Sequence, residues 1–310
     1  MKFTIYQNSR QGPRPYNQDR LAYSYSKDAL LLVVADGMGG HRNGEVAAQL
    51  AVQTLTDAFQ RLAVPFLNNP AKFLQDHIQQ VHDMIESLAQ AEDMVESPRT
   101  TIVAAVIQNG FLYCAHVGDS RLYQFRGGHL LFRTVDHSIV QSMYSKGMIT
   151  YAEMATHPYK NKIYNCIGGD TPPKVELSDR LELQEGDTIL LCTDGIWGFI
   201  DDQQIKDILQ QNPNITEATD KLLNFAEFAC GDKGDNMSAI GLQWGDRLIG
   251  QPMVSTQLMP LGQTTTIINP VTRQDLSNAD PNDLSDDDIE NTIAEIQAAL
   301  NKTQQKPKAK

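Results

Sequence analysis

The stretch LLLVVADGMGG, residues 30–40, decides the fold of this chain. Its first six residues are all apolar, which is typical of a buried strand. The run then changes abruptly into Asp36-Gly37, a common turn dipeptide. Because a buried strand that ends in Asp-Gly brings a carboxylate to the rim of a rigid sheet, the stretch predicts both a sheet and a polar site at its edge.

Three further acidic segments lie in turns of the chain. The apolar run 188–192 leads into Thr193-Asp194-Gly195, and the other two segments are Asn17-Gln18-Asp19 and Asp235-Asn236. Brought together, such segments would form a site of hard oxygen ligands, which Mg²⁺ and Mn²⁺ prefer. A single Asp-Gly is more often a structural turn, so the metal-site interpretation depends on the whole set.

The composition of the 310 residues is that of a globular protein, with 41% hydrophobic and 21% charged residues. The net charge of −12 argues against a nucleic-acid partner or an anionic membrane surface, because both require a concentrated basic face. We find no signal pattern at the N-terminus and no apolar run near the ~20 residues of a membrane span, so we expect a cytoplasmic protein. The four cysteines are widely spaced and predict reduced thiols.

Short apolar or alternating segments, separated by turn residues such as Asn109-Gly110 and Gly127-Gly128, predict a chain rich in strands. Apolar residues at helical spacing predict two long helices between the early and middle strands. Antiparallel strands with helices inserted in pairs indicate an α+β domain in which helices cover a sheet sandwich. The expected strands are 2–8, 20–26, 29–35, 101–108, 110–117, 120–126, 129–134, 175–181, 187–193 and 237–244, and the expected helices are 43–62, 70–91, 138–146, 202–211 and 215–230.

Two regions depart from this pattern. Residues 144–173 are polar and show no clear period, which indicates a mobile irregular insert. Apolar residues become sparse near the C-terminus, so we interpret 1–247 as the folded domain and 248–310 as a disordered tail. Within the tail, a serine and three aspartates precede apolar residues at helical spacing. Residues 285–300 are therefore either a helix that frays in isolation or a docking element.

The motifs in their order resemble those of the metal-dependent protein Ser/Thr phosphatases of type 2C, the PPM family, in their bacterial form. The resemblance implies a four-layer α-β-β-α sandwich, two antiparallel sheets flanked by helices, with a metal site at one end. It also makes the insert 144–173 the family's flap beside that site. The matching segments cover about residues 10–244 and are Arg14-x-x-Asn17-Gln18-Asp19, Val34 to His41, Thr100-Thr101, Ala115 to Arg121, Val135 to Ser138, Ile167 to Gly169, Leu191 to Trp197 and Asp235 to Ser238.

Carried over residue by residue, the resemblance implies a centre of two Mn²⁺ or Mg²⁺ ions. Asp36 would bridge the two ions, and Gly37 would offer its carbonyl oxygen to one of them. Asp194 and Asp235 would bind the other ion. Asp19 would accept hydrogen bonds from metal-bound waters.

Two more positions gain a role from the resemblance. Asp119 matches a residue that helps to bind a third, weaker ion in bacterial relatives. Arg14 matches the arginine that grips the substrate phosphate, and a guanidinium fork suits phosphate oxygens better than a lysine does.

The sequence also departs from the family pattern. Some relatives carry a histidine directly after Asp-Gly as a candidate general acid, and here that place is Met38. His41 lies three residues further on and is the remaining candidate for this proton donor. His116 and His137 adjoin motif aspartates, and we expect both to be structural. Gln18 stands where the family often has glutamate, which should alter the outer metal environment slightly.

The function that the resemblance implies is hydrolysis of phosphoserine and phosphothreonine on proteins by a metal-activated water, opposite a bacterial Ser/Thr kinase. An alternative from another class is a catalytically silent phosphoprotein-binding or scaffold module of the same fold. A third is a two-metal hydrolase of small phosphoesters or nucleic acid. Thr264 and Thr265 resemble phosphothreonine sites read by forkhead-associated domains, although a plain linker is the alternative there. We expect a monomer.

Overall fold

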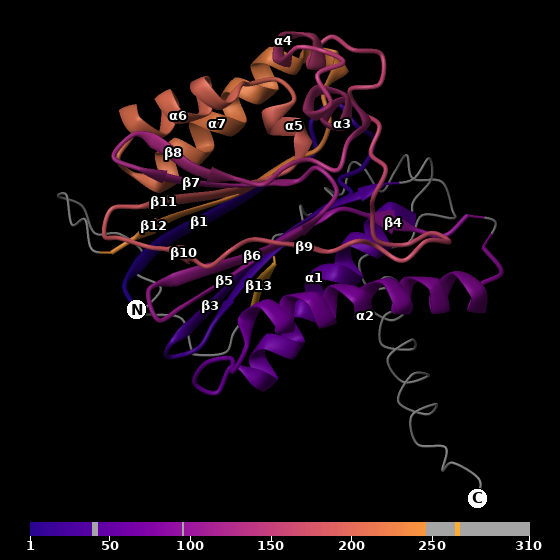
Figure 1. The fold of residues 1–310 in the computed structure, drawn as a ribbon, viewed down its shortest axis with the longest axis horizontal. Helices are drawn as coiled ribbons and strands as arrows, with labels where there is room; N and C mark the ends of the chain where they lie inside the picture. The colour runs from indigo at the N-terminus through magenta and orange to yellow at the C-terminus, as the bar shows by residue number, and fades with distance from the viewer. Residues whose placement is uncertain (39–42, 95, 246–263, 267–310) are drawn as a thin grey trace, which may run out of the picture.

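The computed structural model describes residues 1–38, 43–94, 96–245 and 264–266. Two antiparallel sheets lie face to face, and helices cover the outer face of each, which gives four layers in the order α-β-β-α (Figure 1). The predicted α+β sandwich is therefore confirmed.

The strands of both sheets pair antiparallel with their neighbours. Strands β5 (Ile102–Gln108) and β6 (Phe111–Val117) form one hairpin across Asn109-Gly110, and β7 (Arg121–Arg126) and β8 (His129–Arg133) form another across Gly127-Gly128. The first sheet has the order β1 (Phe3–Arg10), β12 (Met237–Trp244), β11 (Thr188–Cys192), β7 (Arg121–Arg126) and β8 (His129–Arg133). The second has the order β10 (Leu181–Glu182), β6 (Phe111–Val117), β5 (Ile102–Gln108), β3 (Ala29–Met38), β2 (Asp19–Tyr25) and β13 (Thr264–Thr266), with β4 (Arg99–Thr100) on β3 and β9 (Glu176–Leu177) on β6.

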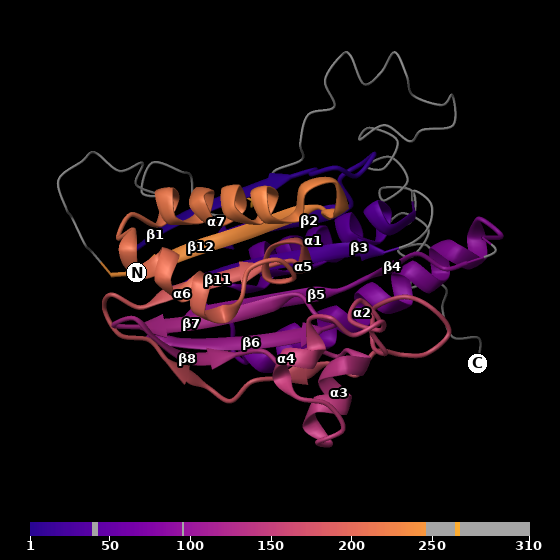
Figure 2. The ribbon, with the colours of Figure 1, turned by 90° about the horizontal axis from the view of Figure 1, so that it is seen from above.

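Long helices form the outer layers. Helices α1 (Asn43–Leu62) and α2 (Pro70–Ala91) cover the second sheet, while α6 (Asp202–Gln211) and α7 (Ile215–Cys230) cover the first, with α7 running along β1 and β12 (Figure 2). Helix α2 begins where the sequence predicts because Asn69 caps it and proline takes its first position. Among the described residues, no helix is both long and apolar enough to cross a membrane.

Short helices lie in the connections. These are α3 (Ile139–Ser145), α4 (Tyr151–Met154), α5 (Asp194–Trp197) and the 3₁₀ turn η1 (Gly231–Lys233). Helices α3 and α5 lie at the same end of the sandwich as β4 (Figure 1).

Three apolar layers fill the space between the four structural layers. Alternate side chains of β3 point to opposite faces, so Leu31 and Val33 join the core under α1 and α2, while Leu32 and Val34 join the core between the sheets. This two-sided burial explains the unbroken apolar run of β3. The third core lies between the first sheet and helices α5 to α7.

The structure differs from the expected elements in a few places. Strand β3 does not end before Asp36 but continues to Met38, because β4 pairs with it there. The expected strand 175–181 is split into β9 and β10. The insert 144–173 contains one short helix, α4, whose start is fixed by a capping box of Thr150 and Glu153.

Three residues of the C-terminal tail lie in the part of the chain that the structure describes. Thr264–Thr266 form strand β13, which pairs with β2 at the edge of the second sheet. The interpretation of the rest of 248–310 as a disordered tail stays a prediction. The helix expected at 285–300 lies outside the described residues.

Candidate active site

Strand register brings four acidic segments to one end of the sandwich. In the antiparallel pair β2–β3, Asp19 lies directly opposite Asp36. In the pair β11–β12, Cys192 lies opposite Ala239, so Asp194 follows the end of one strand and Asp235 precedes the start of the next at the same end. The site is thus assembled from strand ends far apart in the chain.

The backbone of Asp36 is held by Thr100 and Thr101. Its N–H donates to Thr101 Oγ1 at 3.2 Å, and its carbonyl oxygen accepts from Thr100 Oγ1 and Thr101 N–H, both at 2.9 Å. Gly37 follows with no room for a side chain, because a Cβ there would lie 2.1 Å from the Gly44 carbonyl oxygen. The carboxylate therefore projects from a rigid strand and not from a loose turn.

Asn236 fixes the loops around Asp235. Its Oδ1 accepts from Gln18 N–H at 2.9 Å, and its Nδ2 donates to the carbonyl oxygens of Gln11 and Tyr16 at 2.8 and 2.9 Å. Gly195 makes the contact between Asp194 and this loop possible, since a Cβ at Gly195 would lie 2.0 Å from the Asn236 carbonyl oxygen.

The carboxylates repel one another in a buried setting. Burial, together with the charges of Asp194 and Asp235, raises the pKa of Asp19 to about 7. Burial likewise raises the pKa of Asp194 to about 6, with Asp235 as the next cause. Burial and the neighbouring aspartates also raise the pKa of both Asp36 and Asp119 well above the ordinary value. The five aspartates thus form one electrostatically coupled group.

Two oxygens in this group lack a hydrogen-bond partner among the described residues. Asp19 Oδ2 accepts from Thr193 Oγ1 at 2.9 Å, but Asp19 Oδ1 and Asp194 Oδ1 are buried and without one. Buried orphan acceptors are rare in folded proteins because they carry a full desolvation cost. A set of carboxylate oxygens with unused lone pairs suits a hard divalent cation such as Mg²⁺ or Mn²⁺.

Arg14 lies at the mouth of this group. Its Nη2 donates to Asp235 Oδ2 at 2.6 Å, and its side chain is 54% exposed, so the guanidinium is within reach of an incoming phosphate. His41, the candidate proton donor, lies outside the described residues.

His116 and His137 lie beside the site at the base of the flap. Their rings stack at 4.6 Å, and His137 Nε2 lies 3.1 Å from Glu176 Oε2. His137 Nδ1 accepts from Gly118 N–H and from Asn165 Nδ2, so the ring proton is on Nε2 and is donated to Glu176. With that nitrogen protonated and the two rings parallel, the cluster of His116, His137 and Glu176 is poorly arranged to share a metal ion.

Sequence reasoning assigned no role to Arg121 and Asp136, which the structure joins in a buried ion pair beside the site. A signal was available. Tyr123 pairs with Arg133 in the β7–β8 hairpin, so extending that register brings Arg121 level with the residues around 135. A buried polar pair at the open end of a hairpin could have been inferred from this spacing.

Comparison with known proteins bears directly on this arrangement. Residues 8–227 match the family model described as Protein phosphatase 2C. The chain is 32% identical over 229 residues to "Serine/threonine phosphatase stp" of Listeria welshimeri, covering 73% of this chain and 90% of the relative. It is also 32% identical over 219 residues to "Protein phosphatase PhpP" of Streptococcus pneumoniae, covering 70% and 88%.

Solved structures show the same fold. The serine/threonine phosphatase PstP/Ppp of Mycobacterium tuberculosis matches with a TM-score of 0.68 at 28% identity, covering 79% of this chain and 100% of that chain. The catalytic domain of PstP in complex with 2 manganese ions matches with a TM-score of 0.65 at 28% identity, covering 78% and 98%. Because the family model spans more than half of the sequence, this chain belongs to the protein phosphatase 2C family.

Proposed function

We propose that this protein is a metal-dependent protein serine/threonine phosphatase. The observation that carries the proposal is the group of five aspartates at one end of the sandwich, Asp19, Asp36, Asp119, Asp194 and Asp235. Burial and neighbouring carboxylates raise the pKa of the first four, and two buried oxygens of the group lack a hydrogen-bond partner among the described residues. Relatives named as serine/threonine phosphatases support the activity, and a neighbour solved with manganese supports the metal dependence.

The aspartates have distinct places in the proposed centre. Asp36 would bridge two divalent ions, with the Gly37 carbonyl oxygen on one and Asp194 and Asp235 on the other. Asp119 would help to hold a third, weaker ion. When bound, such ions supply a water of lowered pKa as nucleophile and neutralise phosphoryl charge.

The remaining groups position the substrate and the water. Asp19 is fixed by the hydrogen bond from Thr193 and would accept hydrogen bonds from water molecules in the centre. Arg14 would place its guanidinium fork on the phosphate oxygens, exchanging part of its ion pair with Asp235 for the substrate. Donation of a proton to the leaving serine or threonine oxygen by His41 stays a prediction.

The silent binding-module alternative has no observation in its favour, because Asp36, Asp194 and Asp235 are all intact. A Ser/Thr kinase as counterpart, a forkhead-associated domain as reader of Thr264 and Thr265, a cytoplasmic location and a monomeric state all remain proposals. So does the choice between manganese and magnesium.

The test is phosphate release from a phosphothreonine peptide and from a nucleotide, each with Mn²⁺, with Mg²⁺ and with EDTA. We expect metal-dependent release from the peptide and little from the nucleotide. Release from the nucleotide alone would favour a small-phosphoester hydrolase, and no release by folded, metal-loaded protein would favour the binding module.

A further inference from the structure

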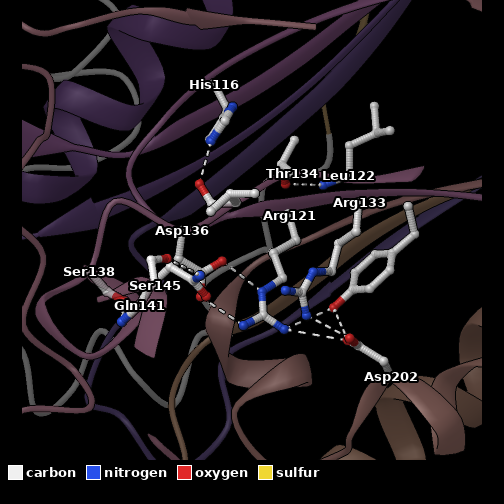
Figure 3. A network of polar contacts seen from close by, with 12 residues as sticks. His116, Arg121, Leu122, Arg133, Thr134, Asp136, Ser138, Gln141, Ser145 and Asp202 are labelled. Atoms are coloured by element: carbon white, nitrogen blue, oxygen red, sulfur yellow. Dashed lines mark hydrogen bonds and ion pairs between the residues drawn. The ribbon is translucent and has the colours of Figure 1, made fainter. Parts of the chain in front are cut away.

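Arg121 is a buried arginine whose polar contacts reach Asp136 and Asp202, which belong to separate segments of the chain (Figure 3). Its Nε and Nη2 donate to the two carboxylate oxygens of Asp136 at 2.8 and 2.7 Å, and the exposed fractions of the two side chains are only 7% and 2%. Its Nη1 donates to Tyr123 Oη at 3.1 Å. The guanidinium also lies 3.6 Å from the centroid of the Trp197 ring. A planar fork and an aromatic stack together are available to arginine but not to lysine.

The stacked tryptophan belongs to the helix that carries a proposed metal ligand. Helix α5 is a single turn, in which Asp194 is the first residue and Trp197 the last. The turn is closed by a hydrogen bond from Gly198 N–H to the Asp194 carbonyl oxygen at 2.8 Å. A shift of the Trp197 ring would therefore move the backbone that holds the Asp194 carboxylate.

Asp136, the ion-pair partner of Arg121, is connected to a second proposed metal ligand, Asp119. Asp136 precedes His137, whose N–H donates to the Gly118 carbonyl oxygen at 2.9 Å, while Gly118 N–H donates to His137 Nδ1 at 3.1 Å. Asp119 follows directly. The segment Asp136–His137, to which Arg121 is bound, is thus hydrogen-bonded to the loop that carries Asp119.

We propose that Arg121 is a positioning residue of the metal centre, which fixes α5 and its Asp194 against the Asp136–His137 segment and its Asp119 loop. This inference depends on the proposed function, because it takes Asp194 and Asp119 as metal ligands. Among the described residues, Arg121 donates a hydrogen bond to neither carboxylate, so its positioning effect passes through Trp197 and Asp136. Its charge, which acts directly on Asp119, is retained when lysine replaces it.

The same strand offers a matched control. Arg126, at the other end of β7, also makes a bidentate pair, with Asp187 at 2.7 and 2.8 Å, and Asp187 is fully buried. Five residues of strand separate the two arginines by roughly 17 Å. Arg121→Lys and Arg126→Lys therefore remove the same kind of interaction, one near the site and one far from it.

The experiment measures Mn²⁺ dissociation constants by calorimetry and thermal unfolding in EDTA for the full chain and both variants. We expect both variants to unfold at lower temperature, while only Arg121→Lys binds Mn²⁺ more weakly, by about threefold to thirtyfold, the range of coupling through packed networks. Equal Mn²⁺ affinity in Arg121→Lys and the wild type would overturn the proposal. A wild type that binds no Mn²⁺ would instead remove the metal centre itself.

A double-mutant cycle decides the matter if Arg121→Lys does not fold. Asp136→Asn and Trp197→Leu each remove one contact of the guanidinium. If Arg121 transmits the effect, the two substitutions break the same connection. The double variant then loses less Mn²⁺ affinity than the losses of the two single variants multiplied together. Additive effects, or none, would contradict the proposal.

Discussion

The surroundings of Asp19 and Asp194 disfavour the ionised form of each carboxyl group. Each is buried near other carboxylates, and each has an oxygen without a hydrogen-bond partner among the described residues. An uncompensated buried charge is costly, and the cost falls either when a proton binds or when a cation does. Protons and divalent metals should therefore compete for the same oxygens.

The stability of the metal-free protein should depend on pH through these groups. Their folded pKa values, about 7 and about 6, exceed the ordinary value of 3.8, so the folded state binds more protons than the unfolded state between those limits. Stability from this source is present at low pH and is lost as pH rises through about 6 to 7. We expect unfolding in EDTA at a higher temperature at about pH 5.5 than at about pH 8, with a smaller difference in Asp194→Asn. If the unfolding temperature in EDTA changes with pH equally in the wild type and in Asp194→Asn, this expectation is contradicted.

The sequence pattern marks the acidic residues of the candidate site, but it does not predict the hydrogen bonds that hold them in place. Asp36 and Asp194 follow apolar runs, which marks them in the sequence. The contacts that hold them, such as Asn236 with Gln18, join residues more than 200 positions apart. Such pairs depend on how the strands are ordered in the sheets, which local patterns do not specify.

Among the elements, α5 shows how a short turn can depend on a neighbouring loop. Gly195→Ala would place a Cβ 2.0 Å from the Asn236 carbonyl oxygen and push α5 away from Asp235. We expect a loss of about 1–3 kcal/mol in the free energy of unfolding and Mn²⁺ binding weakened by about tenfold. Chemical denaturation and calorimetry would measure both.

Gly110→Ala is the control for this substitution. Gly110 has a φ of 76° but no atom near its would-be Cβ, so the change adds backbone strain without a clash. It should cost about 1–2 kcal/mol and leave Mn²⁺ binding unchanged. Similar metal affinities in the two variants would show that the contact of α5 with Asn236 does not matter.

The flap is anchored more firmly than its irregular sequence suggests. Its base is tied by backbone hydrogen bonds from Ile139 to Lys162, from Tyr164 to His137 and between Thr100 and Ile167. Only the tip, about residues 147–158, can be removed without breaking them.

Shortening this tip tests its role in substrate choice. Replacing 147–158 by a short glycine-serine linker should raise KM for phosphopeptides while leaving hydrolysis of a small aryl phosphate unchanged, because the metal centre is untouched. Steady-state kinetics with both substrates would check this. Loss of both activities in a folded variant would show that the tip supports the centre itself.

At the scale of the whole molecule, a sheet sandwich covered by helices followed from the sequence pattern, because apolar strands and amphipathic helices have few ways to pack. The four-layer order was implied only by the resemblance to the type 2C phosphatases. The end of the folded region was less predictable. Strand β13 follows a stretch without apolar alternation, and it pairs through backbone on the edge of β2. Edge pairing requires little from the side chains, so sequence patterns give a weak signal for it.

Removal of residues 248–310 should therefore have a small effect. Loss of β13 uncovers the edge of β2, so we expect the melting temperature to fall by roughly 2–4 °C. Phosphatase activity with Mn²⁺ should persist, because no residue assigned to the metal centre lies in the tail. A truncated protein that folds but lacks activity would show that the domain boundary is misplaced.

The central claim is that aspartates from separate strand ends form one metal centre. Equilibrium Mn²⁺ binding, followed by electron paramagnetic resonance, tests it most directly in wild type, Asp36→Asn and Asp194→Asn. We predict about two tightly bound ions per chain in the wild type, as in two-metal hydrolases, and weaker binding of at least one ion in each variant. Unchanged binding in both folded variants would contradict the account.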